Sequence, residues 1–285
     1  MPSFRDMVAG PHPVCATLAL DPLMARLAES AGHHALYLGG GATGYAKVVL
    51  EANLTLTEMV QAGLDIRTVS SLPLILDGAA GWGDPMHMHR TIALTEAAGF
   101  AAIELEDQLL PKRAHHHVGI EHMVPQELMV AKVREAVAAR REDLFIIART
   151  NGVRASSMDD ALRRVEAYRE AGADALLLLP RNQEEARHIG ERLAPPLMLL
   201  TGGGGLAGLD MTPAELHGLG FRILVDAMTP LLAAFEAMRA VYQETAGDFT
   251  LRSRPVADWK VATDALHEVI GLARLIAIEK DTVEQ

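Results

Sequence analysis

Cysteine is almost absent from this chain, and so are long apolar runs. Cys15 is the only cysteine among the 285 residues, so no intramolecular disulfide can form and a reducing compartment is expected. No run approaches the ~18 apolar residues that a membrane-spanning helix needs. The first ten residues, MPSFRDMVAG, lack the apolar core of a signal peptide. These absences predict a cytoplasmic protein with no membrane partner.

An excess of basic residues is also missing. The chain has 26 Lys and Arg against 37 Asp and Glu, for a formal net charge of −11. This charge argues against nucleic acid as a partner, while a local basic pocket for a small acid is still compatible with it. Hydrophobic residues make up 49% and charged residues 22%, which is typical of a globular protein with a sizeable core.

Apolar segments alternate with helical patterns along most of the chain. We expect strands at residues 13–20, 35–38, 73–76, 101–105, 144–148, 175–179, 197–200 and 222–225. These are continuous apolar runs, as expected for strands that are buried on both faces of a parallel sheet. Eight strand–helix units over ~230 residues predict an α/β fold, a (β/α)8 TIM barrel. A doubly wound open sheet is the second possibility. It would have one dominant switch point, whereas here polar residues follow nearly every strand.

The end of the chain departs from this alternation. We expect a catalytic barrel domain over residues 1–247 and a linker with a C-terminal helical extension over residues 248–285. Within the extension, residues 249–259 are the expected linker and residues 260–279 one further helix with no strand before it. The apolar positions of that helix could pack on the barrel itself or on a neighbouring subunit.

Polar residues stand where the predicted strands end, and in a barrel of this kind the chemistry lies at that face. Oxygen ligands suit Mg²⁺, which takes one or two carboxylates and keeps water and substrate in its other positions. An arginine there can bind a carboxylate through two parallel hydrogen bonds, and backbone N–H groups of a glycine turn can bind an anionic oxygen. The strand-end residues are Asp21, Gly39, Gly40, Gly41, Asp77, Glu106, Asp107, Arg149, Thr150, Arg181, Thr201, Gly202 and Asp226.

A basic, histidine-rich loop follows the acids of the fourth predicted strand. It carries Lys112 and Arg113 and then three consecutive histidines, His115 to His117. Such a loop is consistent with a lid over the site. One of these histidines, with His116 as our candidate, could act as an acid, because an unperturbed imidazole titrates near ~6.5. The alternative is an exposed lid whose histidines point into water, and a zinc site is disfavoured.

Several motifs together resemble the isocitrate lyase/phosphoenolpyruvate mutase superfamily, in particular its oxaloacetate decarboxylase-like branch. They are DPLMARLAESAG followed by YLGGG, LTLTEM, LILDGAAGWGDP, AGFAAIELEDQ, PKRAHHH, IIARTN, AYREAGADALLL and PLMLLT. The resemblance implies a (β/α)8 barrel that binds Mg²⁺ or Mn²⁺ and makes or breaks bonds next to the carbonyl of 2-oxo acids, through an enolate held on the metal. It also implies a homotetramer, a dimer of dimers, with a C-terminal helix exchanged between subunits.

The resemblance further implies roles for individual residues. Asp77 matches the direct metal ligand, and Glu106 matches the acid that holds a metal-bound water. Arg149 matches the arginine that binds the substrate carboxylate, and Gly40 and Gly41 match the turn whose N–H groups bind the oxo-acid oxygens. Gly39 and Thr201 complete the expected substrate-binding set.

Two departures from the family pattern bear on the reaction. The third strand ends in Asp77-Gly78-Ala79, so a second acid that the family usually carries at the position of Ala79 is missing, and Glu51 is only a nearby candidate for a further family aspartate. In the lid, Ala114 stands where the lyase branches have a cysteine, which disfavours the isocitrate and methylisocitrate lyase reactions.

We therefore expect a metal-dependent carbon–carbon lyase acting on a small 2-oxo dicarboxylate. Decarboxylation of oxaloacetate to pyruvate and CO₂ is the favoured reaction. One alternative is a phosphonopyruvate hydrolase, or an enzyme like the phosphoenolpyruvate and carboxyphosphonoenolpyruvate mutases. Another is a barrel without catalysis that binds an organic acid.

Overall fold

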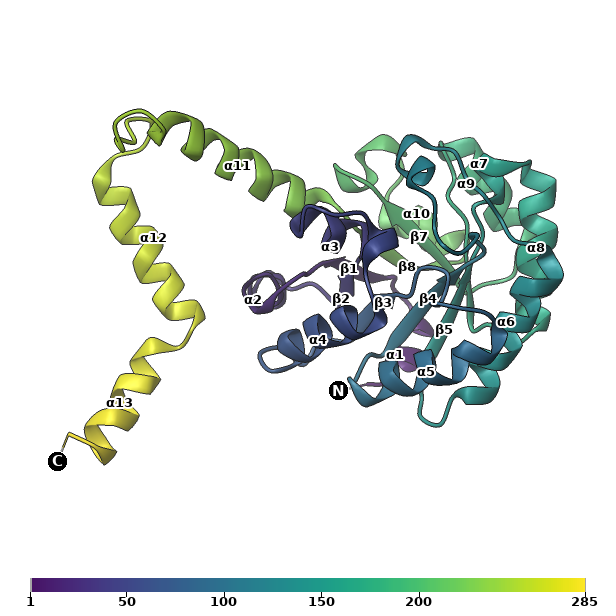
Figure 1. Cartoon of the computed structure of the whole chain (residues 1–285), viewed down its shortest axis with the longest axis horizontal. Helices are drawn as coiled ribbons and strands as arrows, with labels where there is room; N and C mark the ends of the chain where they lie inside the picture. The colour runs from purple at the N-terminus through teal and green to yellow at the C-terminus, as the bar shows by residue number, and fades with distance from the viewer. Residues whose placement is uncertain (1, 285) are drawn as a thin grey trace. The chain divides into compact units, whose positions relative to one another are not determined.

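A closed barrel of eight parallel strands forms the centre of the first part of the chain (Figure 1). The computed structural model describes residues 2–284. Each strand pairs with the next, and the last pairs with the first. The predicted (β/α)8 barrel and all eight predicted strands are confirmed. The strands are β1 (Val14–Leu18), β2 (Ala35–Leu38), β3 (Leu74–Asp77), β4 (Ala102–Glu106), β5 (Phe145–Arg149), β6 (Ala175–Leu177), β7 (Leu197–Thr201) and β8 (Phe221–Asp226).

Helices alternate with the strands and surround the barrel (Figure 1). Local sequence explains where several of them begin. Asp21 caps the helix that starts at Pro22, and its carboxylate accepts the N–H of Met24 at 2.8 Å. Thr55 and Glu58 form a capping box at another helix start. The helices around the barrel are α2 (Pro22–Ser30), α4 (Leu56–Arg67), α5 (Met88–Ala97), α6 (Gln126–Ala139), α8 (Met158–Glu170), α9 (Gln183–Arg192) and α10 (Pro213–Gly218), and α11 (Thr229–Thr245) follows β8.

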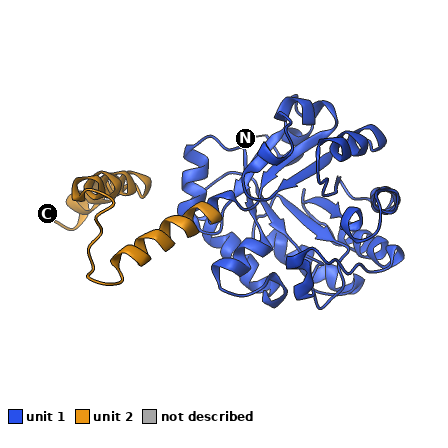
Figure 2. Cartoon of the chain, turned by 90° about the horizontal axis from the view of Figure 1, so that it is seen from above, with its two compact units in different colours: residues 1–231 blue, residues 232–285 orange. Residues whose placement is uncertain are grey.

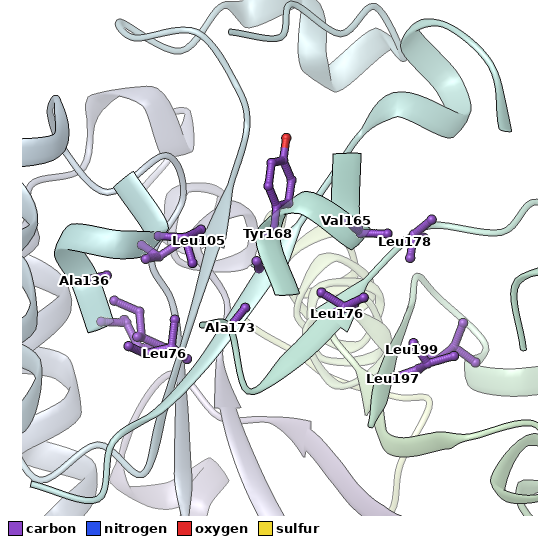
Figure 3. Packing of buried hydrophobic residues seen from close by; sticks show 14 of the residues in the cluster. Leu76, Leu105, Ala136, Val165, Tyr168, Ala173, Leu176, Leu178, Leu197 and Leu199 are labelled. Atoms are coloured by element: carbon purple, nitrogen blue, oxygen red, sulfur yellow. The ribbon is translucent and has the colours of Figure 1, made fainter. Parts of the chain in front are cut away.

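Side chains along each strand alternate between the barrel interior and the layer under the helices. In β3, Leu74 and Leu76 belong to the outer apolar layer, while Ile75 belongs to the apolar residues inside the barrel. Figure 3 shows part of the outer layer, where Tyr168 of α8 lies among aliphatic side chains with its hydroxyl pointing away from them. The same alternation sends the side chains of Asp77 and the last residues of β4 and β5 into the interior.

The amino end of the barrel is closed by a short helix that the sequence analysis did not predict. This helix, α1 (Phe4–Val8), places Phe4 and Val8 in the interior apolar cluster. The ring of Phe4 meets that of Phe145, the first residue of β5, edge to face at 5.5 Å between centroids. The interior is therefore sealed by apolar side chains at this end, and its charged residues lie at the other.

The second compact unit spans residues 232–285, shown in orange in Figure 2. It contains most of α11, then α12 (Val256–Val269) and α13 (Leu272–Thr282). The single helix expected over residues 260–279 is wrong, because Gly271 adopts a left-handed conformation with φ of 69° and separates two helices. The expected linker is also shorter, since α12 already begins at Val256. Exchange of this segment between subunits, and the division into residues 1–247 and 248–285, stay predictions.

Many large apolar side chains of this unit are exposed. They include Phe235, Met238, Tyr242, Val256, Trp259, Val261, Leu266, Ile270, Leu275, Ile276 and Ile278. Within residues 2–284, no helix is both long and apolar enough to cross a membrane.

Candidate active site

Buried charged side chains gather at the carboxyl end of the barrel. Four of them are acids and two are bases, and each is less than 9% exposed, which is rare for charged residues unless they are paired. Hydrogen bonds connect strands β2, β4 and β5 with the loops that follow them. We call this set the interior cluster; its members are Glu51, Asp77, Glu104, Glu106, Lys112 and Arg149.

Glu106 lies at the centre of the interior cluster. Its Oε1 accepts a hydrogen bond from Lys112 Nζ at 2.6 Å, and its Oε2 accepts one from Asn151 Nδ2 at 2.9 Å and lies 3.3 Å from Arg149 Nε. Burial alone would raise the pKa of Glu106, but the charges of Arg149 and Lys112 outweigh burial and lower the pKa to about 2. Glu106 is therefore ionised, and hydrogen bonds fix both of its carboxylate oxygens.

Arg149 is held by two hydrogen-bond partners, one on the neighbouring strand β4 and one just after its own strand. Its NH1 donates to Glu104 Oε1 at 2.7 Å, while Nε and NH2 both donate to Asn151 Oδ1, at 3.3 and 3.0 Å. Burial favours the neutral guanidine, yet the charges of Glu106, Glu104 and Asp77 keep the pKa of Arg149 well above its usual value. The guanidinium is thus a fixed positive charge in the barrel.

Glu104 extends this network to β2. Its Oε2 accepts the hydroxyl of Tyr37 at 2.9 Å, opposite the contact with Arg149. Burial raises the pKa of Glu104 to about 7, with Asp77 adding to the rise and Arg149 opposing it. Sequence analysis missed both Glu104 and Tyr37. The alternation of a strand was the available signal, because Glu104 lies two residues before Glu106 and so faces the same way.

Glu51 enters the cluster from a short 3-10 helix, Glu51–Asn53, that follows β2. Its Oε2 accepts Lys112 Nζ at 2.6 Å, while its buried Oε1 has no hydrogen-bond partner. Burial and the charge of Asp77 raise the pKa of Glu51 to about 8. A Cβ at Gly40 would lie 2.7 Å from Glu51 Cγ, so only glycine leaves room for this side chain. Glu51, which the sequence offers only as a nearby candidate for a further family aspartate, therefore lies in the site.

Asp77 is bound by backbone N–H groups on both oxygens. Oδ2 accepts the N–H of Gly40 at 2.9 Å, and Oδ1 accepts the N–H of Ala79 at 3.0 Å. The glycines are not an open turn, because Gly40 and Gly41 begin helix α3 (Gly40–Ala46) with Gly39 as its N-cap. The N–H of Gly40, expected to face substrate, is directed at Asp77 here.

The interior cluster fits a divalent cation. Four carboxylates and two bases leave a net charge of −2 when all six are ionised, and Glu51 Oε1 is an oxygen without a partner. Among residues 2–284, no three His, Cys, Asp or Glu side chains converge as a ready metal site. Asp77 and Glu106 would therefore supply few protein ligands, with water and substrate in the remaining positions, as Mg²⁺ often requires.

The loop after β4 places its histidines apart from the interior cluster. His116 Nδ1 lies 2.7 Å from Glu121 Oε2, and Gln108 contacts both of them. His117 Nδ1 meets the hydroxyl of Tyr45 at 2.9 Å. Lys112, not a histidine, is the side chain of this loop that enters the acid cluster. The role of His116 as a proton donor stays a prediction.

Thr201 ends β7 and is nearly buried, as expected for a residue at the mouth of the barrel. Its hydroxyl donates to the carbonyl of Val225 on the neighbouring strand at 2.9 Å. The expected substrate role of Thr201 stays a prediction.

Asn151 is a residue that sequence analysis missed, and it lies two positions beyond Arg149. Its side chain joins Arg149 to Glu106.

Asp107 follows Glu106 directly but faces the other side of the strand. Its Oδ2 accepts hydroxyls from Thr150 at 2.6 Å and Tyr168 at 2.9 Å, and its Oδ1 accepts the N–H of Asn151 at 3.1 Å. Arg164 NH1 lies 3.4 Å away. Burial raises the pKa of Asp107, and these hydrogen bonds oppose the rise. Asp107 thus fastens the end of β5 to α8.

Comparison with known sequences agrees with the fold and the strand-end residues. The sequence model of phosphoenolpyruvate phosphomutase matches residues 4–246. The chain belongs to the phosphoenolpyruvate mutase/isocitrate lyase superfamily. The superfamily recognised from the motifs is thereby confirmed, and most of the first compact unit and part of the second lie within the match.

Individual members are similar to this chain over most of their length. It is 32% identical to 2,3-dimethylmalate lyase of Eubacterium barkeri over 283 residues, 96% of this chain and 95% of the relative. It is 35% identical to oxaloacetate decarboxylase of Pseudomonas putida strain GB-1 over 240 residues, 82% and 81% of the two chains. A structure of phosphonopyruvate hydrolase with oxalate and Mg²⁺ superposes with a TM-score of 0.83 at 28% identity, covering 98% and 97%.

Proposed function

We propose that this protein is a Mg²⁺- or Mn²⁺-dependent carbon–carbon lyase acting on a small 2-oxo dicarboxylate, and that it decarboxylates oxaloacetate to pyruvate and CO₂. The observation that carries the proposal is the interior cluster, in which buried acids outnumber bases beside the fixed guanidinium of Arg149. A cation would balance the acids, and the arginine would bind an anionic substrate. The likeness to oxaloacetate decarboxylase of Pseudomonas putida supports the choice of substrate.

Each residue then has a defined part. Asp77 would hold the cation, which when bound would supply a Lewis acid to polarise the 2-oxo group. Glu106, fixed by Lys112 and Asn151, orients a water beside it. Arg149 binds a substrate carboxylate, with Thr201, Gly39 and Gly41 at the same end of the barrel, while the N–H of Gly40 holds Asp77. Because these groups are already held by hydrogen bonds, little rearrangement is needed when substrate binds.

Loss of CO₂ needs no general base. The electron pair of the breaking carbon–carbon bond moves toward the 2-oxo group, and the resulting enolate takes a proton to form pyruvate. That proton comes from water or from the lid, where His116 is our candidate donor. Ala114, in the position where the lyase branches carry a cysteine, supports decarboxylation over the isocitrate lyase type of cleavage.

A second candidate is a phosphonate reaction. The match to phosphoenolpyruvate phosphomutase and the likeness to phosphonopyruvate hydrolase favour it. A phosphoryl group would need several cationic or N–H donors. In the described part of the chain the bases of the interior cluster, Lys112 and Arg149, are both paired with acids. This arrangement favours the decarboxylase.

The direct test is the rate of pyruvate formation from oxaloacetate with and without Mg²⁺. We expect wild-type protein to exceed the background rate of Mg²⁺ alone, and Asp77→Ala to fall to that background. Asp21→Ala is a matched control, because Asp21 also follows a strand but only caps α2. Rates for wild type and Asp77→Ala that both equal the background of Mg²⁺ alone would reject the decarboxylase, and the organic-acid-binding barrel would then be the better account.

We also propose that copies of the chain associate, as the expected homotetramer. The exposed apolar side chains of the second unit support this, because isolated chains rarely expose so many. Light scattering at several protein concentrations measures the mass in solution. A monomer at all concentrations would contradict the proposal.

A further inference from the structure

Tyr37, Glu104 and Arg149 form a chain of hydrogen bonds across the inside of the barrel, from β2 through β4 to β5. The hydroxyl of Tyr37 donates to one oxygen of Glu104 at 2.9 Å, and Arg149 NH1 donates to the other at 2.7 Å. Glu104 is 1% exposed and Tyr37 is also 1% exposed. Glu104 therefore cannot turn toward solvent, and it stays beside the guanidinium.

The donors left on Arg149 can be counted. A guanidinium carries five N–H groups. Nε and NH2 each donate one to Asn151 Oδ1, and NH1 donates one to Glu104. Two N–H groups remain, which is the number that one carboxylate accepts in a bidentate pair. A phosphonate has a third oxygen, and Arg149 has no further donor to offer it.

The charge of Glu104 also favours a carboxylate over a phosphonate beside Arg149. The carboxyl group of Glu104 is buried 2.7 Å from Arg149 NH1, and when ionised it offsets part of the arginine's charge. A phosphonate at the remaining donors carries up to one more negative charge than a carboxylate, and this extra charge would face Glu104 in a buried site. Electrostatic repulsion between buried like charges is strong, because little solvent screens it.

We propose that Glu104 is a specificity-determining residue, which restricts Arg149 to a carboxylate and excludes a phosphonate in its place. This inference rests on the proposed function only in taking Arg149 as the residue that binds substrate. It names the class of acceptable group at that position, and it assigns Glu104 a part that acts through Arg149 without touching the bond that breaks.

The test compares two stable ligands with the same skeleton, malonate and phosphonoacetate, in which one carboxylate is replaced by a phosphonate. Isothermal calorimetry with Mg²⁺ present gives both dissociation constants. We expect wild type to bind malonate on the order of tenfold more tightly, and Glu104→Gln to remove most of that preference. Tyr37→Phe keeps the carboxylate of Glu104 and should keep the preference. Glu135→Gln, which changes an exposed acid paired with His89, is the matched control.

An unchanged ratio of the two constants in folded Glu104→Gln would overturn the inference, as would equal binding of both ligands, or no binding of malonate, by wild type. The wild-type ratio is informative even if Glu104→Gln fails to fold, which thermal unfolding would reveal. The outcome is separable from the proposed reaction. Protein that prefers malonate through Glu104 but forms no pyruvate from oxaloacetate would refute the decarboxylase and leave this inference standing.

Discussion

Glu106 and Asp107 are neighbours in the chain, yet they end in two different kinds of surroundings. Asp107 faces α8, where donors from Thr150, Tyr168 and the backbone of Asn151 satisfy both its oxygens. Glu106 faces the barrel interior, where acids outnumber bases and Glu51 keeps a buried oxygen without a partner. A buried acid whose bonds are complete stabilises the fold. A group of acids with uncompensated charge is suited to a ligand that comes from outside.

The largest effect should follow removal of the charge of Glu106. Glu106→Gln keeps the shape of the side chain but loses the carboxylate that Lys112 and Arg149 bind. We expect decarboxylation to fall by about 10³-fold, the size seen when one preorganised electrostatic group is lost. Initial rates at saturating Mg²⁺ measure it. A variant with wild-type activity and an unchanged melting temperature would place the chemistry elsewhere.

Removal of Asp107 should act on stability instead. Asp107→Ala leaves the hydroxyls of Thr150 and Tyr168 buried without their acceptor and removes one of the two acids beside Arg164, which keeps Asp160. We expect the free energy of unfolding to fall by about 3 kcal/mol. Urea denaturation measures it. A loss of activity in Asp107→Ala with no loss of stability would erase the distinction between the two acids.

The pH dependence of metal-free protein should expose the excess charge of the interior cluster. The folded-state pKa values of Glu51 and Glu104 are raised from 4.5 to about 8 and about 7. The folded protein thus keeps protons that the unfolded chain has released, and the stability from these two acids falls as pH rises from about 4.5 to about 8. The pKa of Glu106 is lowered, so its contribution is lost only as pH falls from 4.5 toward about 2.

Thermal unfolding across this range, in chelator, should show a falling melting temperature from mildly acidic to mildly alkaline pH. The variant Glu51→Gln should flatten the curve, because it removes one of the two titrating groups. A melting temperature that rises over the same range, in wild type and variant alike, would show that burial and the neighbouring charge of Asp77 do not raise the pKa values of these acids as the structure indicates.

The smallest effect should come from the loss of one hydroxyl at Asp107. Thr150→Val keeps the shape of the side chain and removes the hydroxyl that donates to Asp107 Oδ2 at 2.6 Å and accepts the N–H of Gly152 at 3.1 Å. We expect a loss of about 1 kcal/mol in the free energy of unfolding and little change in activity. Equilibrium unfolding in urea measures the first, and initial rates the second. A loss as large as that of Asp107→Ala would mean that the hydroxyl of Thr150 accounts for the whole stabilising effect of Asp107.

The fold was predictable because it follows from local patterns. Continuous apolar runs predicted each strand, and cap residues such as Asp21 predicted helix starts. Apolar spacing continues across Gly271 and predicts one helix in place of α12 and α13, because a single left-handed residue does not change that spacing.

The candidate site was predictable only in part. Asp77, Glu106 and Arg149 stand at strand ends, where chain position alone brings them together. Glu51 and Lys112 come from loops, and nothing in their local sequence shows that their side chains meet inside the barrel. The sequence analysis missed Glu104 because this residue lies within an apolar strand and not at its end.

The most direct test of the central claim is whether the interior cluster binds a divalent cation. Thermal unfolding of wild type, Asp77→Asn and Asp107→Asn with and without Mg²⁺ measures this, because a ligand that binds only the folded state raises the melting temperature. We predict that Mg²⁺ raises the melting temperature of wild type and of Asp107→Asn, and leaves that of Asp77→Asn unchanged. A wild-type melting temperature that does not respond to Mg²⁺ or Mn²⁺ at millimolar concentration would contradict the account.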